Sequence, residues 1–308
     1  MNLQQLEYIT MLEKHRHFGK AADACGVTQP TLSTMIQKLE EELGVKLFER
    51  NRQSVEPTSI GTKVIEQAKK ILQQSIVVKE LVQDEVESLK GNLRIGILPT
   101  IAPYLLPIIT PSIQKKLPDI KINFVELITS ECIESLCSND IDIAIIASSA
   151  SNDNIQDRKL FYEEFLGYVS QNEDLFSQNV IRTSEINSKN LWMLDEGHCF
   201  RDQLVKFCEL YKNSNRQFNY HKGSLSTFIH LVDMGHGVTF VPELFTIYAT
   251  EEQKKQIKHF TIPRPARCIT MCTRTDFVRT KIIDALYEII VTSIPESMKT
   301  LKVGQVEI

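Results

Sequence analysis

The chain has 308 residues, 42% of them hydrophobic, a formal net charge of -4 and an isoelectric point near 6.0. This length and apolar content allow two or three compact units with hydrophobic cores. The slightly acidic balance excludes a generally basic nucleic-acid binder, so any contact with DNA has to come from locally placed Lys and Arg side chains.

Nothing in the sequence has the pattern of an export signal or a membrane anchor. Charges interrupt the apolar residues of the N-terminal segment every few positions, whereas a signal peptide needs about seven apolar residues in a row. No later stretch approaches the ~18 to 20 apolar residues of a membrane span. We therefore expect a cytoplasmic protein that does not contact a membrane.

The cysteines are expected to be thiols rather than structural disulfides. Their number, seven, is odd, and a reducing compartment keeps thiols reduced. No two C-x-x-C motifs combine into a zinc site. The sequence therefore predicts neither a metal site nor a cofactor.

The first 44 residues have the pattern of a helix-turn-helix. Apolar periodicity predicts an opening amphipathic helix that ends near residues 15–17. In the next segment, FGKAADACGVTQPTLSTMIQKLEEELG, Gly26 ends one helix, and Thr28 caps a second helix that runs to about Leu43. The apolar stripe of this second helix is predicted to be buried.

The exposed face of that second helix is the candidate DNA-reading surface. Short polar side chains and glutamine at the N-terminus of a recognition helix reach base edges and phosphates. The residues expected there are Gln29, Pro30, Thr31, Ser33, Thr34 and Gln37. A short hairpin over residues 46–61 would form a wing, with Arg50 and Arg52 near its tip to contact the sugar-phosphate backbone. The alternative is an ordinary solvated helix face.

From Thr58 onward the pattern is helical for about thirty residues. Apolar and small residues step by four and three positions from Val64 to Val82, which predicts a helix-helix seam between two chains and hence a homodimer. The alternative is a helix that packs on its own domain. The order of opening helix, AADACGVTQPTLSTMIQKLEEELGVKLFERN, wing and long helix resembles the DNA-binding head of LysR-type transcriptional regulators. The sequence PTSIG after the wing departs from the usual pattern of that family, without an expected effect on the fold.

Strands and helices alternate after residue 90. Apolar runs at 93–98, 120–127 and 141–147 predict strands, with helices over about 103–116 and 130–138 between them. A second set, which includes LWMLDEG as a strand-like run, follows Phe161, and the chain returns to the first set near 268–274. This alternation predicts two α/β lobes with a mostly parallel sheet and a ligand-binding cleft. The layout is similar to the LysR-type effector domain, which resembles periplasmic binding proteins and ordinarily binds a small organic acid.

The expected architecture is therefore α/β overall, in three parts. Residues 1–58 form an all-α winged helix-turn-helix, 59–90 a linker and dimerisation helix, and 91–308 a two-lobed, periplasmic-binding-protein-like regulatory domain. Lobe I comprises about 91–161 and 268–300, and lobe II about 162–267.

The segment HCFRDQLVKFC, residues 198–208, places two cysteines nine positions apart. A helix that begins near Phe200 would put Cys208 on its apolar stripe and at least partly bury it. Nine residues at 1.5 Å each separate the Cα atoms by roughly 13 Å, whereas a disulfide needs about 7 Å or less. A bond between Cys199 and Cys208 therefore requires this helix to unwind, as in a switch.

Cys199 is the better candidate for a reactive thiol. A helix N-terminus just after it and the neighbouring Arg201 favour the thiolate, which peroxide oxidises to a sulfenic acid that a second thiol can resolve. By spacing alone, two such cysteines are more often packing residues. We expect the other five cysteines to be small core residues, namely Cys25, Cys132, Cys137, Cys268 and Cys272.

The chain resembles the hydrogen peroxide sensors of the LysR-type family over essentially its whole length. The segments DEGHCFRDQ and LPTIAPYLLP and the N-terminal segment carry this resemblance. The resemblance implies that Cys199 is the peroxidatic thiol and Cys208 the resolving one. It also implies that a peroxide pocket contains Thr100, Thr129, His198, Asp202 and Arg267. Arg267 lies in the sequence RPARC, which departs from the usual neighbourhood of the family arginine. From its position alone, after a strand and before a helix, Thr100 could hold a polar ligand, but a helix N-cap is the more common role for such a residue.

The resemblance further implies partners. Homodimers or homotetramers would bind double-stranded promoter DNA, the oxidised form would recruit RNA polymerase, and a thiol reductant such as a glutaredoxin or thioredoxin would reset the switch. The function expected is a peroxide-sensing transcriptional activator that is not an enzyme. Two alternatives remain: a LysR-type regulator that binds a small organic acid between its lobes, and a thiol peroxidase.

Overall fold

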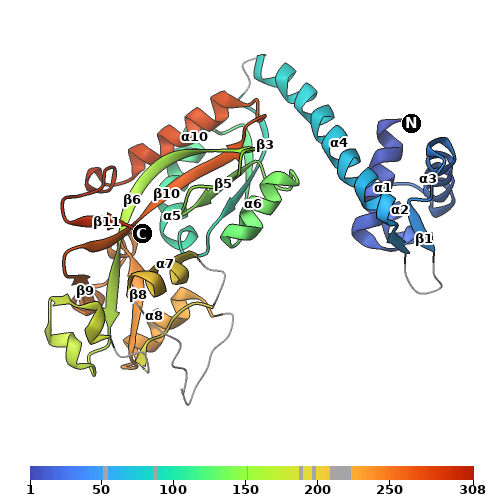
Figure 1. Ribbon diagram of the computed structural model, residues 1–308. Coiled ribbons are helices and arrows are strands. Elements are labelled where there is room, and N and C mark those ends of the chain that lie inside the picture. The colour runs from blue at the N-terminus through green and yellow to red at the C-terminus, as the bar shows by residue number, and fades with distance from the viewer. Residues whose placement is uncertain (51–54, 86–88, 151, 187–189, 196–198, 209–222) are drawn as a thin grey trace. The chain divides into compact units, whose positions relative to one another are not determined.

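The chain divides into two compact units, Met1–Glu87 and Ser88–Ile308. The computed structural model describes residues 1–50, 55–85, 89–150, 152–186, 190–195, 199–208 and 223–308 (Figure 1).

The N-terminal unit is built on three short helices. They are α1 (Leu3–His15), α2 (Phe18–Ala24) and α3 (Gln29–Leu43). Thr28 caps α3 through its side chain as expected, and Gly44 ends the helix at φ 68°, a conformation that suits glycine. The predicted stripe of α3 is buried at Leu32, Ile36 and Leu39, which pack with α1 and α2 in one core. The helix-turn-helix is therefore confirmed, and its last stripe residue, Leu43, is exposed.

A two-stranded wing and a long helix complete this unit. Strands β1 (Phe48–Arg50) and β2 (Val55–Pro57) pair antiparallel, and α4 runs over Ser59–Glu85. The buried Glu40 carboxylate accepts hydrogen bonds from the Leu47 and Phe48 amides and so fixes the wing to α3. A Cβ atom at Gly61 would lie 2.0 Å from the Leu47 carbonyl oxygen, so only glycine fits there. The glycine of PTSIG thus lets α4 pass close to the wing.

The C-terminal unit contains one mixed sheet with the strand order β4-β3-β5-β10-β6-β9-β7. Three strands in lobe I are parallel: β3 (Gly91–Ile97), β4 (Ile120–Glu126) and β5 (Ile143–Ile146). The long strands β6 (Ile155–Val169) and β10 (Arg264–Arg274) pair antiparallel and serve both lobes. The remaining strands are β7 (Val180–Ile181), β8 (Val238–Pro242), β9 (Ile257–Phe260) and β11 (Gln305–Glu307), of which β8 pairs with β6 and β11 with β10. The sheet is therefore more mixed than the expected mostly parallel one.

Helices cover this sheet and enclose two hydrophobic cores. The helices of this unit are α5 (Ala102–Lys116), α6 (Thr129–Cys137), α7 (Cys199–Phe207), α8 (Leu225–Asp233), α9 (Glu251–Gln256) and α10 (Thr280–Ser293), and α8 contributes to both cores. Short 3-10 helices occupy Asp174–Ser177, Thr183–Glu185, Glu243–Ile247 and Glu296–Met298. The run LWMLDEG does not form a strand in its described part, where Leu191 makes one isolated bridge with Val238.

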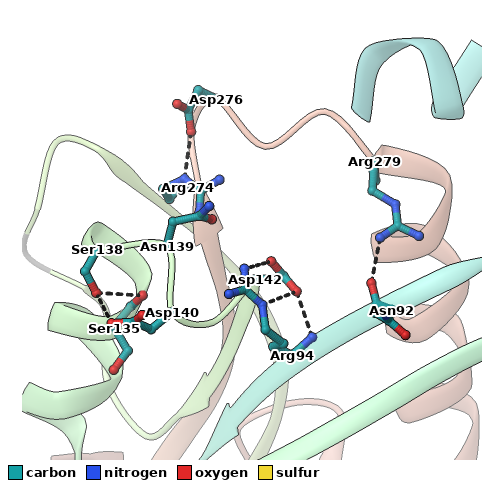
Figure 2. Close-up of polar contacts among 10 residues, drawn as sticks. All are labelled: Asn92, Arg94, Ser135, Ser138, Asn139, Asp140, Asp142, Arg274, Asp276 and Arg279. Atoms are coloured by element: carbon teal, nitrogen blue, oxygen red, sulfur yellow. Dashed lines mark hydrogen bonds and ion pairs between the residues drawn. The ribbon is translucent and has the colours of Figure 1, made fainter. Parts of the chain in front are cut away.

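Polar contacts fix the beginning of β3 to the rest of lobe I (Figure 2). Arg279, at the start of α10, donates hydrogen bonds to the main-chain oxygens of Lys90 (2.7 Å) and Asn92 (2.8 Å). Arg94 pairs with the buried Asp142 carboxylate at 2.7 Å. The two hydrogen bonds from Arg279 hold the backbone on both sides of Gly91, the first residue of β3.

Candidate functional site

Cys199 is the first residue of α7, and it lines a small pocket. In this structure the pocket is partly open and has no room for a water-sized molecule, and its lining is Leu98, Thr100, Ile128, Thr129, Cys199 and Phe200. These residues come from the segment that follows β3, the N-cap and first residue of α6, and the first two residues of α7. The fold thus brings together three residues expected at the site, namely Cys199, Thr100 and Thr129.

A buried arginine outside the pocket lining holds Thr100 by two hydrogen bonds. Arg267, on β10, is fully buried and donates hydrogen bonds from Nη1 to Thr100 Oγ1 (3.0 Å) and from Nη2 to the Thr100 carbonyl oxygen (3.2 Å). Thr100 does not cap α5, because the N-cap position of that helix is Ile101. Since a guanidinium only donates, Thr100 Oγ1 accepts this bond, and the hydroxyl hydrogen of Thr100 remains available to another acceptor.

Glu163 on β6 pairs with the edge of Arg267 formed by Nε and Nη2, next to the edge that binds Thr100. Its Oε1 accepts a hydrogen bond from Arg267 Nε (2.8 Å) and lies 2.5 Å from Nη2. Glu163 is 1% exposed, and burial raises the pKa of its carboxyl while the charge of Arg267 opposes that rise. The rings of Phe165 and Phe200 lie over the guanidinium, with centroids 5.6 and 4.9 Å from Cζ. Phe200 therefore touches both the arginine and the pocket of its neighbour Cys199.

Thr129 presents the second hydroxyl of the pocket. Its Oγ1 is buried and makes no hydrogen bond within the described part of the chain. A buried hydroxyl without a partner is costly, so such an atom is suited to a polar ligand. The pocket thus offers two hydroxyls and one thiol to a small molecule that can donate and accept hydrogen bonds.

Of the remaining two expected pocket residues, Asp202 and His198, only Asp202 has a described position, away from the pocket lining. Asp202 is 58% exposed on α7, where its carboxylate lies 3.6 Å from Arg201, and it is not part of the pocket lining. His198 lies outside the described residues.

Cys208 follows the last turn of α7 and is 7% exposed, which confirms the expected burial. It packs in the lobe II core, and burial raises its pKa to about 12. Cys199 and Cys208 are both free thiols at opposite ends of α7, about 13 Å apart by helix geometry. A disulfide between them requires α7 to unwind.

The other cysteines are mostly core residues. Cys132, Cys268 and Cys272 are buried, and Cys25 is half-buried. Cys137 is exposed, so the expectation of a core position is wrong there. It is the last residue of α6, on the solvent side of that helix.

The candidate DNA-reading residues lie on the outer side of α3. Five of the six are exposed and Ser33 is half-buried: Gln29, Pro30, Thr31, Ser33, Thr34 and Gln37. The hydroxyls of Thr28 and Thr31 lie 2.8 Å apart, and Gln37 donates to Glu41 (2.9 Å). Arg50 ends strand β1, but its side chain and all of Arg52 lie outside the described residues.

Sequence reasoning missed Glu163, Phe165 and Gln203. Gln203, on α7, donates hydrogen bonds to the main-chain oxygens of Ala147 (3.1 Å) and Ile308 (2.7 Å). No local pattern distinguishes these residues, because their partners are distant in the sequence. A charged residue inside a strand that is otherwise buried, as at Glu163, is the one available signal.

No helix in the described part of the chain is long and apolar enough to cross a membrane. The described residues also contain no group of three or more His, Cys, Asp or Glu side chains able to hold a metal ion.

Comparison with known families defines the class of protein. Residues 3–62 match the family described as bacterial regulatory helix-turn-helix protein, lysR family, and residues 87–294 match the LysR substrate binding domain. The chain belongs to the LysR family of transcriptional regulators. The fold expectation is confirmed as a helix-turn-helix followed by a mixed α/β domain, but the periplasmic label needs correction, because the matching model is the regulators' own domain.

Within that family, the chain is similar to OxyR proteins. It is 33% identical over 276 residues to the hydrogen peroxide-inducible genes activator of Haemophilus influenzae, over 89% of this chain and 91% of that one. The crystal structure of OxyR from Porphyromonas gingivalis is 46% identical, with a TM-score of 0.67, over 71% of this chain and 99% of that one. A full-length OxyR variant from Pseudomonas aeruginosa is 32% identical, with a TM-score of 0.75, over 94% of this chain and 98% of that one.

Proposed function

We propose that this regulator activates transcription in response to hydrogen peroxide, which it detects by oxidation of Cys199. The observation that carries the proposal is the small pocket in which Cys199 meets the hydroxyls of Thr100 and Thr129. The similarity to peroxide-inducible activators supports the same ligand. Both hydroxyls suit peroxide, because each of its oxygen atoms can donate and accept hydrogen bonds.

The chemistry requires two steps. The Cys199 sulfur attacks one oxygen of hydrogen peroxide, so that an S–O bond forms, the O–O bond breaks and water leaves after it takes up the thiol proton. The Cys208 thiol then attacks the sulfenic sulfur, which forms a disulfide and releases a second water. Because Cys208 lies at the far end of α7, the second step follows unwinding of that helix.

In this proposal Arg267 polarises Thr100, while His198 and Asp202 assist proton transfer as α7 rearranges. Arg267 is supported by its two hydrogen bonds to Thr100. The exposure of Asp202 limits it to a role at the mouth of the site or after unwinding.

The N-terminal unit is proposed to read promoter DNA as a homodimer or homotetramer. Residues 1–58 would bind DNA through the outer side of α3 and the wing arginines, residues 59–90 would pair two chains, and residues 91–308 would sense peroxide. On α4, Ala68 packs in its own unit, whereas Ile71 (42% exposed) and Val78 (63% exposed) remain available to a partner helix. The oxidised form would recruit RNA polymerase, and a glutaredoxin or thioredoxin would reduce the disulfide.

Peptide mass spectrometry tests the central claim. Reduced protein is given a brief, near-stoichiometric peroxide pulse, free thiols are blocked, and the linkage between Cys199 and Cys208 is quantified. Rapid and dominant formation of this linkage is expected, with loss of the linkage in Cys199→Ser. If Cys199 stays reduced while peroxide persists, the proposal is wrong.

A further inference from the structure

The pair formed by Glu163 and Arg267 lies behind the thiol pocket rather than in it. Both side chains are buried, and neither is among the residues that line the pocket. Arg267 nevertheless reaches the pocket through Thr100, which it contacts with two nitrogens. The orientation of the guanidinium therefore decides where the Thr100 hydroxyl points.

Glu163 fixes that orientation. Its Oε1 holds the Nε edge of the guanidinium, which leaves Nη1 directed at Thr100 Oγ1. The rings of Phe165 and Phe200, whose centroids are 4.9 Å apart, lie together on one side of the guanidinium and offer it no acceptor in its plane. Without the carboxylate, the guanidinium of Arg267 could rotate against these rings and lose its hydrogen bonds to Thr100.

We propose that Glu163 is a positioning residue for the oxidation of Cys199, and that it acts by holding Arg267 so that the Thr100 hydroxyl donates its hydrogen to peroxide in the pocket. This inference rests on the proposed function. When the Cys199 sulfur attacks one oxygen of peroxide, the other oxygen accumulates negative charge as the O–O bond breaks, before it takes up a proton and becomes water. A hydroxyl that already accepts a charged hydrogen bond is a stronger donor to that oxygen.

The sequence supplies a matched control next to Glu163. Glu164 is also buried, at 3% exposed, but by strand alternation its side chain points to the other side of β6. There it binds His259 Nδ1 (2.8 Å) and Gln305 Nε2 (3.1 Å). Glu164→Gln removes the same charge one residue away without a contact to Arg267.

The test is made in the full-length chain with Cys208→Ser, so that Cys208 does not consume the sulfenic acid formed at Cys199, and both reactions are followed on the peptide that contains Cys199. Sulfenic acid formation with hydrogen peroxide is followed by dimedone trapping, and alkylation by iodoacetamide reports access to the same thiol. Glu163→Gln is expected to slow peroxide oxidation by about tenfold or more while alkylation changes by less than about threefold. Glu164→Gln is expected to leave both rates within about twofold.

A double-mutant cycle distinguishes positioning from a general structural effect. Thr100→Val should slow peroxide oxidation selectively, and Glu163→Gln should add little once Thr100 is replaced, because both changes remove one interaction. The proposal is overturned if Glu163→Gln slows peroxide oxidation and iodoacetamide alkylation of Cys199 by the same factor. It is also overturned if Glu163→Gln slows peroxide oxidation as much in the Thr100→Val background as it does with Thr100 in place.

Glu163→Asp provides the same test if the glutamine variant does not fold, since it keeps the charge but shortens the reach to Arg267. Its rates of peroxide oxidation and of alkylation at Cys199 are each compared with those of the parent, and its folding is verified by circular dichroism. Failure of the proposed function has a different signature, because peroxide would then leave Cys199 reduced even with Glu163 in place.

Discussion

Gln203 on α7 donates a hydrogen bond, 2.7 Å long, to the main-chain oxygen of Ile308, the residue after strand β11. The same amide nitrogen also holds the Ala147 carbonyl oxygen. Helix α7 is thus tied to two segments of the regulatory unit that lie far from it in the sequence. Because disulfide formation requires α7 to unwind, these two contacts are expected to break on oxidation.

The first prediction is that peroxide loosens β11. Oxidised protein should exchange the amide hydrogens of residues 305–307 at least about threefold faster than reduced protein, because this short strand loses a contact that anchors its end. Hydrogen exchange with mass spectrometry measures this directly. In Cys208→Ser, peroxide leaves α7 wound, so exchange should not change. Protection that is equal in the reduced and disulfide forms would show that α7 and β11 are not coupled.

The second prediction concerns the burial of Cys208. Its pKa of about 12 in the folded chain, against an ordinary 9.0, means that folding favours the protonated thiol. This contribution to stability is complete below pH 9 and declines as pH rises towards 12, because the unfolded chain ionises first. Between these limits, the free energy of unfolding should fall by about 1.4 kcal/mol per pH unit through this group.

Urea unfolding at several alkaline pH values tests this against Cys208→Ala. The difference in unfolding free energy between the two proteins should narrow as pH rises above 9.0. Cys137→Ala is the control, because it removes an exposed thiol rather than a buried one. If the unfolding free energies of the parent chain and Cys208→Ala change with pH in parallel, the resolving thiol is not held protonated by burial.

The third prediction separates function from stability at Thr129. Thr129→Val removes a buried hydroxyl that has no partner in the described structure, so the unfolding free energy should stay within about 0.5 kcal/mol of the parent or rise. Oxidation of Cys199 by peroxide should nevertheless slow by about tenfold or more, because the pocket loses a hydrogen-bonding group.

Thr270→Val gives the opposite pattern. The Thr270 hydroxyl donates to the Ser148 carbonyl oxygen (2.7 Å) away from the pocket, so its loss should cost about 1 to 2 kcal/mol of stability and leave the oxidation rate unchanged. Thermal or urea unfolding and dimedone trapping measure the two quantities. An unchanged oxidation rate in Thr129→Val would remove Thr129 from the site.

The sequence predicts different parts of this molecule unequally well. The N-cap, the end and most of the buried stripe of α3 are local signals: Thr28 caps the helix and the helix ends at Leu43, both as expected. The hydrogen bonds that hold Thr100 at the pocket are not local in the sequence, since Arg267 is 104 residues from Glu163 and 167 residues from Thr100. The resemblance identified Arg267 and Thr100, but the carboxylate that orients the arginine became apparent only when β6 and β10 were paired.

The fourth prediction concerns DNA. Gln29 is exposed at the first position of α3, where a side chain can reach base edges, so Gln29→Ala should weaken binding to a specific operator by about 1 to 3 kcal/mol. Binding to random duplex and the slope of affinity against salt should not change, because phosphate contacts remain. Arg50→Ala should instead weaken binding to both duplexes and reduce the salt slope by about one.

Fluorescence anisotropy at several salt concentrations distinguishes these effects. Gln4→Ala is the control, because Gln4 lies on α1 and its amide donates to the Tyr8 hydroxyl (2.7 Å) of the same helix. It should alter neither specificity nor salt dependence. Equal losses on operator and random DNA for Gln29→Ala would mean that the N-terminus of α3 contacts phosphate rather than bases, and the reading surface would then have to be sought further along the helix, towards Ser33 and Gln37.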